Sequence, residues 1–167
     1  ASKTTLDKKP PEDLESIHGW NEDIPTFESP KAVNVKKAPY NAVGDSKTDD
    51  TQALQKAIDE NEIVFLPKGY YNITKTLKLK PNTKLIGVAH VFSNIIARDA
   101  AGYFGDSNNL QPLVETADSK EAETVISNLS IRQPVEISAA FNGDTLPIYA
   151  LKWQSGSKSI LRNVHLN

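Results

Sequence analysis

Hydrophobic and polar positions follow two different rhythms along this chain. Between residues 51 and 61, Leu54, Ala57 and Ile58 recur at the spacing of an amphipathic helix, with Ala53 beside them. The segments that follow are short and β-prone, and turn residues such as Pro67-Lys68-Gly69 and Pro81-Asn82 separate them: "IVFL", "YYNITKTLKL", "KLIGV" and "SNII". A further strand, "AVNV", precedes the helix. The pattern therefore predicts one helix followed by many short strands.

A repeat is visible near the end of the chain. "TVISNLSI", residues 124–131, matches "SILRNVHL", residues 159–166, in the order small hydroxyl, two aliphatics, polar, Asn, aliphatic, polar, aliphatic. Short strands of one design with Asn at a fixed place indicate the stacked coils of a solenoid. The offset exceeds the roughly 20–30 residues common for one coil. We therefore expect "RQPVEISAAFNGDTLP" to be an inserted loop.

The repeat also predicts where side chains point. Asn128 should lie over Asn163 at a bend between two strands, where Asn tolerates the left-handed conformation and can hydrogen-bond the Asn of the next coil. The alternation then assigns inward and outward positions: Leu129, Ile131, Val164 and Leu166 inward, Ser130 and His165 outward.

The stretch "NAVGDSKTDDTQALQKAIDENEIVFLPKGYYNITKTLKL" begins with a cluster of polar residues, Asp45, Thr48, Asp49, Asp50 and Thr51. It resembles the opening of the pectate-lyase-like right-handed β-helix superfamily, in which [GN]AxGDGxTDDTxAxxxAI precedes VxxPxGxY. The likeness covers residues 33–88 and includes proteins similar to family 55-type β-1,3-glucanases, polygalacturonase-like glycoside hydrolases, epimerases and phage tailspikes. It implies an all-β fold, a right-handed single-stranded parallel β-helix with a capping helix at about 51–61. We expect residues 1–32 to be an irregular arm and residues 33–167 to be the N-terminal coils.

In that family the helix covers the end of the solenoid, so the resemblance assigns this polar cluster to turns and the helix cap. Competing chemistry does not fit: "GDSKT" lacks the GxxxxGK[ST] pattern of a phosphate loop, and Lys47 occupies a position where a calcium loop needs an oxygen ligand. Ser46 stands where the family pattern has Gly, which matters if the position needs positive φ.

The composition of the chain limits the classes of partner and ligand that it is expected to bind. The net charge is −2, with no long run of one sign, which argues against nucleic acid or a membrane surface. Cysteine is absent, so thiolate chemistry is excluded, and we expect no cofactor. His18, His90 and His165 are scattered and none has ligand spacing, so no histidine metal site is expected, while a calcium site built from carboxylates stays open.

Candidate substrate-binding residues are few. Glycoside hydrolysis needs two carboxyl groups about 5–10 Å apart, and Glu136 or Asp144 could approach another acid on an adjacent coil. His165 and Arg132 could form a polar stripe beside Ser130, with solvated surface residues as the alternative. Trp153 shares the parity of Leu151, which favours core packing over stacking on a sugar.

These observations predict the N-terminal part of a secreted or cell-surface carbohydrate-active enzyme, most simply a glycoside hydrolase acting on β-glucan or pectin. Its main catalytic carboxylates would lie on later coils, because the chain stops at "RNVHLN" on a strand pattern. Further coils or another chain should cover that open end. The alternative is a non-catalytic glycan-binding or structural β-helix, tailspike-like or adhesin-like; a polysaccharide lyase or epimerase comes third.

Overall fold

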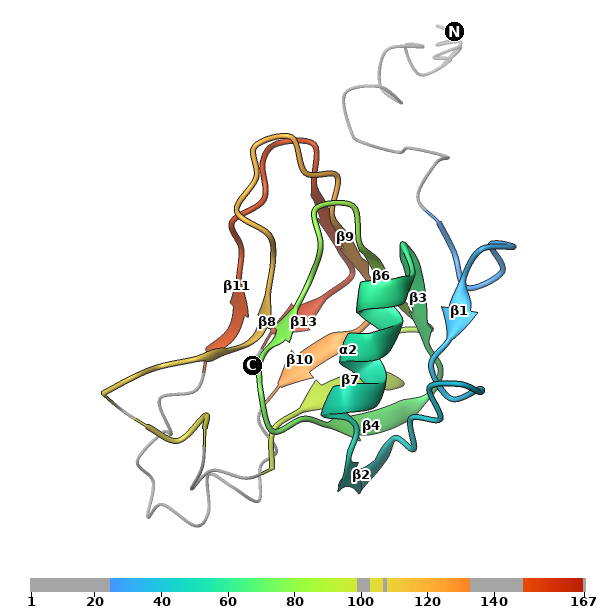
Figure 1. Cartoon of the computed structure of the whole chain (residues 1–167), viewed down its shortest axis with the longest axis vertical. Coiled ribbons are helices and arrows are strands. Elements are labelled where there is room, and N and C mark those ends of the chain that lie inside the picture. Colours follow the sequence, from blue (N-terminus) through green and yellow to red (C-terminus); the bar gives the residue numbers. More distant parts are fainter. Residues whose placement is uncertain (1–24, 99–102, 107, 133–148, 167) are drawn as a thin grey trace, which may run out of the picture.

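The computed structural model describes residues 25–98, 103–106, 108–132 and 149–166. Its strands form three parallel sheets, and most circuits of the chain contribute one strand to each sheet (Figure 1). Sheet A contains β1 (Val33–Asn34), β3 (Ile63–Leu66), β6 (Lys84–Gly87), β9 (Val125–Ser127) and β12 (Ile160–Arg162). Sheet B contains β2 (Asp45–Asp49), β4 (Gly69–Asn72), β7 (Ser93–Ile96), β10 (Ser130–Arg132) and β13 (His165–Leu166). Sheet C contains β5 (Leu77–Lys78), β8 (Pro112–Glu115) and β11 (Tyr149–Lys152).

This arrangement is the predicted parallel β-helix. Each strand buries alternate side chains inside the coil, as in β3, where Val64 and Leu66 are fully buried. The segment "YYNITKTLKL" is two strands rather than one, because the chain turns a corner of the solenoid between β4 and β5. The sequence pattern also missed β2, whose residues are polar and mostly exposed.

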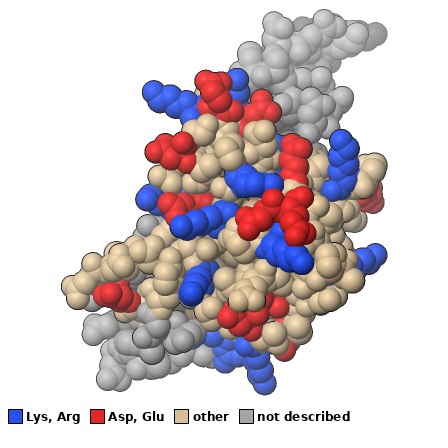
Figure 2. All heavy atoms as spheres, in the orientation of Figure 1, with Lys and Arg blue, Asp and Glu red and all other residues tan. Residues whose placement is uncertain are grey.

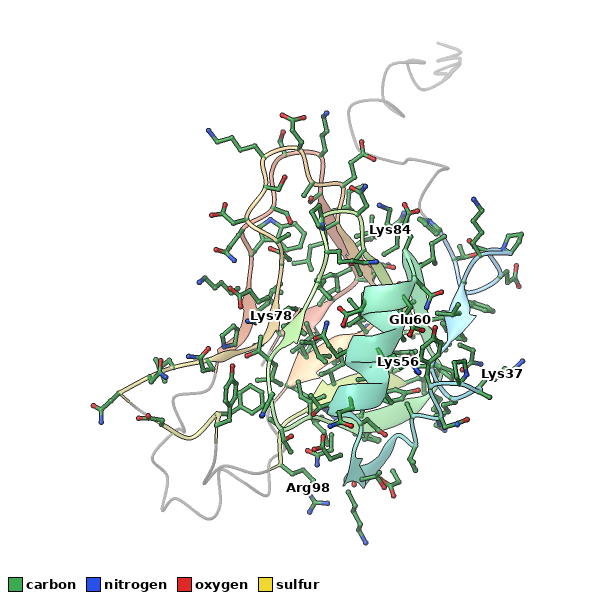
Figure 3. All side chains as sticks on the ribbon, in the orientation of Figure 1. Lys37, Lys56, Glu60, Lys78, Lys84 and Arg98 are labelled. Carbon is green, nitrogen blue, oxygen red and sulfur yellow. The ribbon has the colours of Figure 1, made fainter. Side chains whose placement is uncertain are left out.

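Helix α2 (Thr51–Glu60) follows β2 directly and packs against β3 and β5. It buries Leu54, Ala57 and Ile58, the residues that the periodicity selected. Its other face carries Lys56 and Glu60, an exposed i,i+4 pair with Nζ and Oε1 4.0 Å apart (Figure 3). The helix therefore covers one end of the apolar interior, as the resemblance implied.

The repeat has the register read from the sequence. Ile160 pairs with Val125 in sheet A and His165 pairs with Ser130 in sheet B. Asn128 and Asn163 have φ of 57° and 50°, and Asn163 Nδ2 donates to Asn128 Oδ1 at 3.2 Å. Stacked left-handed Asn residues thus turn the chain from sheet A to sheet B in two successive coils.

Two residues differ in burial from the inward and outward positions that the repeat predicted. Ser130 stands on the outer face as expected but is buried, because its hydroxyl donates to the His90 carbonyl of the preceding coil. Leu166 is largely exposed, since β13 is the edge strand of sheet B and no described coil lies above it. Leu129 and Ile131 are fully buried, as predicted.

Candidate functional site

The outer face of sheet B places polar and aromatic side chains of four successive coils in one row. Tyr70, Asn94, Ser130 and His165 are register partners on β4, β7, β10 and β13. Their chain neighbours Tyr71, Ile95 and Ile131 are fully buried inside the coil. Strand alternation therefore directs the row outward, across the strands rather than along one of them.

Tyr70, Asn94 and Arg132 form the centre of this face. The Arg132 guanidinium carbon lies 5.5 Å from the centroid of the Tyr70 ring, a cation–π contact. Arg132 starts on β10 and Tyr70 stands on β4, so the Arg132 side chain crosses β7, the strand that carries Asn94. Tyr70 itself remains 41% exposed.

Asn94 is the unusual member of the row. It is 1% exposed, and among the residues that the structure describes its Oδ1 has no hydrogen-bond partner. Its Nδ2 makes one long contact of 3.5 Å with the Gly69 carbonyl. A buried acceptor without a donor costs about 1–3 kcal/mol, so this side chain is held at a free-energy cost.

An apolar corner borders the same face. Residues 88–92 project between β6 and β7, where the later coils turn with only two residues between their strands. Val91 and Phe92 are 58% and 46% exposed. Lys68 Nζ lies 5.4 Å from the centroid of the Phe92 ring, a second cation–π pair, and these two residues immediately precede β4 and β7. Sheet B and the corner beside it thus carry two pairs of an aromatic ring and a cation.

The polar cluster before α2 makes local hydrogen bonds. Asp45 accepts from the backbone N–H groups of Lys47 and Thr48 and from the Thr48 hydroxyl, at 2.7–2.9 Å. Asp49 Oδ1 accepts from the N–H of Thr51 at 3.0 Å and from its hydroxyl at 2.5 Å. The same Thr51 hydroxyl accepts from the N–H of Thr74 at 2.8 Å, which ties the start of the helix to the next coil.

Asp50 departs from the predicted cap role. It precedes α2 without a side-chain bond to the helix, and its two carboxylate oxygens instead accept from the N–H groups of Val43 and Gly44, both at 2.8 Å. The carboxyl is therefore a loop clamp, which holds the chain that enters β2. Ser46 has φ of 68°, so the family's Gly position does need the left-handed conformation.

The pKa shifts in this cluster follow from these contacts. Burial raises the pKa of Asp50, and the two backbone donors oppose that shift without cancelling it. Burial also acts to raise the pKa of Asp49, but the hydrogen bonds from Thr51 and Thr74 outweigh it and lower the pKa. Backbone hydrogen bonds from Thr48 and Lys47 lower the pKa of Asp45. Local hydrogen bonds therefore set the direction of the pKa shift for Asp45 and Asp49, whereas burial sets it for Asp50.

The structure separates the predicted site residues. Arg132 and His165 do lie on one face, but Arg132 reaches toward Tyr70, while His165 stacks on His90 with 6.0 Å between ring centroids. The sequence pattern favoured core packing for Trp153, and this prediction is wrong. Trp153 is 37% exposed, because β11 ends at Lys152, just before it. Glu136 and Asp144 lie outside the described residues.

Several other charged groups are already paired. On sheet C, Glu115 lies 3.5 Å from Lys152 Nζ and accepts from Gln154. A shallow hollow lined by Glu62, Lys80, Pro81 and Asn82 lies at the corner between sheets C and A. Its charges are also occupied: Glu62 lies 3.8 Å from Lys84 Nζ, and Lys80 donates to the Asp59 carbonyl. These regions offer weaker candidate sites than sheet B.

Sequence reasoning missed Tyr70, Asn94, Phe92 and Lys68. Their signal was the coil alignment of residues 69–72 with residues 93–96, which the projecting corner at residues 88–92 conceals. Arg98 was also missed: Figure 3 places it below β7, and its guanidinium lies 3.4 Å from the Ser46 hydroxyl of β2.

The face of the molecule that is visible in Figure 2 carries no dominant charge. Figure 2 shows Lys and Arg side chains interspersed with Asp and Glu over the visible face. Among the helices of the described segments, none has the length and apolar character needed to cross a membrane.

Stacked coils whose strands form parallel sheets, with a helix covering one end, place the chain in the class of parallel β-helix proteins. The chain belongs to the rhamnogalacturonase A/epimerase, pectate lyase-like family, whose model matches residues 32–167.

Curated relatives match about half of this chain. A glucan 1,3-beta-glucosidase of Cochliobolus carbonum is 31% identical over 88 residues, covering 50% of this chain and 11% of the relative. A probable glucan endo-1,3-beta-glucosidase of Arthroderma benhamiae is 36% identical over 88 residues, with 51% and 9% covered. A pre-neck appendage protein of Bacillus phage B103 is 32% identical over 80 residues, with 44% and 9% covered. The chain thus spans about a tenth of the length of these relatives.

Two solved structures align with this chain at lower sequence identity than the curated relatives do. A mannuronan C-5 epimerase A-module of Azotobacter vinelandii aligns with a TM-score of 0.48 and 24% identity, covering 58% of this chain and 27% of that one. A protein of Geobacillus virus E2 aligns with a TM-score of 0.46 and 25% identity, covering 71% and 23%.

Proposed function

We propose that this chain is the N-terminal part of a secreted, polysaccharide-acting β-helix protein and that it binds glycan on the outer face of sheet B. The observation that carries the proposal is Asn94 Oδ1, a buried acceptor that finds no donor among the described residues and that stands on β7, the strand between those of Tyr70 and Arg132. A sugar offers hydroxyl donors and an apolar ring face, which suit an amide acceptor beside an aromatic ring.

The finer proposal is a glycoside hydrolase with β-1,3-glucan as its first candidate polymer. Two curated relatives named as glucan 1,3-beta-glucosidase and probable glucan endo-1,3-beta-glucosidase support it. The residues that bind sugar here would then position the polymer, and the paired carboxylates of hydrolysis would belong to coils beyond this chain. A non-catalytic glycan-binding β-helix is the second candidate, supported by the phage appendage relative.

The binding test uses this chain with β-1,3-gluco-oligosaccharides and, separately, oligogalacturonates, followed by calorimetry and by NMR of the side-chain amides. Asn94→Leu removes the acceptor at similar volume, so binding should be lost while the free energy of unfolding stays equal or rises, because an unsatisfied buried group disappears. Tyr70→Ala should weaken binding roughly threefold to tenfold through lost ring contact. Phe27→Ala, which removes an exposed ring stacked on Phe65 of sheet A, is the matched control.

Glucan binding that Asn94→Leu abolishes and Phe27→Ala spares would support the site. Equal binding by wild type and Asn94→Leu would reject it. Preference for oligogalacturonate over glucan would keep the site but replace the glucanase assignment with a uronate-acting one. To separate the two candidate functions, reducing-sugar release from β-1,3-glucan should be measured on a polypeptide as long as the glucanase relatives.

A further inference from the structure

His90 and His165 lie in different coils and meet on the surface. Their ring centroids are 6.0 Å apart with 26° between the ring planes, and both side chains are exposed. From this pair we infer a binding site for a divalent transition-metal ion that prefers imidazole ligands, of which Cu²⁺ should bind most tightly. The inference does not rest on the proposed glycan-binding function, although His165 belongs to the same row on sheet B as Tyr70 and Asn94.

Both histidines are anchored to the same short piece of backbone. Ser130 donates its hydroxyl to the His90 carbonyl, and Ser130 is the strand partner of His165. The N–H of His165 also donates to the Leu129 carbonyl at 3.1 Å. The two Cα positions are therefore fixed relative to each other, and only the exposed rings need to rotate.

The spacing suits one shared ion. Metal–nitrogen bonds to imidazole are about 2.0–2.1 Å long, which places the centres of two rings on one ion roughly 5–6 Å apart, according to the angle at the metal. The observed 6.0 Å lies at the edge of that range. The rings are now nearly parallel, so binding requires them to rotate until one nitrogen of each points at the ion. Neither rotation is blocked by burial.

The donor set also predicts which ions bind. Within the segments that the structure describes, no group of three or more His, Cys, Asp or Glu side chains is placed to hold a metal. Two imidazoles would therefore be the protein ligands, with water completing the shell. Such a set suits Cu²⁺, Ni²⁺ and Zn²⁺ rather than Ca²⁺ or Mg²⁺, which prefer oxygen ligands. A bound ion would cross-link the projecting corner at residues 88–92 to β13.

The test is calorimetric titration of the full chain with Cu²⁺, and with Mg²⁺ as the oxygen-preferring comparison. We expect one Cu²⁺ per chain, no detectable heat with Mg²⁺, and at least about tenfold weaker Cu²⁺ binding in His90→Gln and in His165→Gln. His18→Gln is the matched control, because His18 is the one histidine of the three in the chain that does not belong to the proposed site. It should retain wild-type affinity.

A second readout separates loss of the site from loss of the fold. Since both rings are exposed, the metal-free unfolding midpoint of each variant should equal that of wild type, and added Cu²⁺ should raise the midpoint of wild type and His18→Gln only. Cu²⁺ binding that survives in the double variant H90Q/H165Q would overturn the proposal. So would the absence of binding by wild type at millimolar Cu²⁺, or loss of binding in His18→Gln.

Discussion

Gly87→Ala tests how closely the coils of this solenoid approach one another. Gly87 ends β6, where the chain turns toward the next sheet. A Cβ added at this position would lie 2.2 Å from the Asn128 carbonyl oxygen and 2.7 Å from Ser93 Cβ. Because the nearest atom belongs to the backbone of the neighbouring coil, a side-chain rotation cannot relieve the contact.

The expected loss in the free energy of unfolding follows from how far the Asn128 carbonyl must move. Ordinary non-bonded contacts of carbon are about 3.5 Å, so the Asn128 carbonyl would have to recede by roughly 1 Å. It is restrained: the N–H of Asn128 donates to Arg162 at 3.1 Å, and its side chain accepts from Asn163. Overpacking of a tight site costs about 1–3 kcal/mol, and the backbone clash places Gly87→Ala at the upper end, about 3 kcal/mol. For a chain of this size that corresponds to a fall in Tm of roughly 6–12 °C.

The measurement is thermal and urea unfolding of the full chain, followed by far-ultraviolet circular dichroism. Val88→Ala is the matched control, because it changes the next residue, which is 40% exposed, and should alter the free energy of unfolding by no more than about 0.5 kcal/mol. If Gly87→Ala unfolds at the same midpoint as Val88→Ala, the coils can separate at this corner without cost and the reasoning from close approach is refuted.

Two further substitutions test the buried groups around β2 and β4. Asp50→Ala leaves the N–H groups of Val43 and Gly44 without their acceptor and should lower the free energy of unfolding by about 2 kcal/mol in urea titrations, whereas Asp59→Ala on the exposed face of α2 should have little effect; equal effects would contradict the clamp. Tyr71 is fully buried, and burial, followed by the charge of Asp50, raises its pKa. Stability that depends on the neutral phenol is therefore present below the unfolded-state pKa of about 10 and is lost as the pH rises above it. Tyr71→Phe should lower the free energy of unfolding by about 1 kcal/mol at pH 7, because the hydrogen bond to the Pro67 carbonyl is lost. Between about pH 10 and 12 the free energy of unfolding of Tyr71→Phe should fall less steeply than that of wild type. Parallel pH profiles of the two proteins would argue against this cause.

The fold could be predicted largely from the sequence because its signals are local. Leu54, Ala57 and Ile58 specify which side of α2 is buried, whatever the rest of the chain does. Asn128 and Asn163 mark two equivalent bends, since few other residues accept positive φ and also offer an amide to the coil above. Local conformational preference and strand alternation were enough to reveal the stacking register of the last two coils.

The candidate sites needed the tertiary structure because they are built across coils of unequal length. Tyr70, Asn94 and Arg132 come from three coils, and the corner at residues 88–92 lengthens one of them, so no fixed sequence interval relates these residues. The same corner carries His90 to His165, which looked unrelated along the chain. The sequence by itself determined a solenoid with Asn bends, because each coil encodes its own turns and inward positions, and the resemblance to the pectate-lyase-like superfamily supplied the parallel strands and the capping helix. Only the tertiary structure decided which outward side chains meet, because that depends on the summed lengths of all the loops between them.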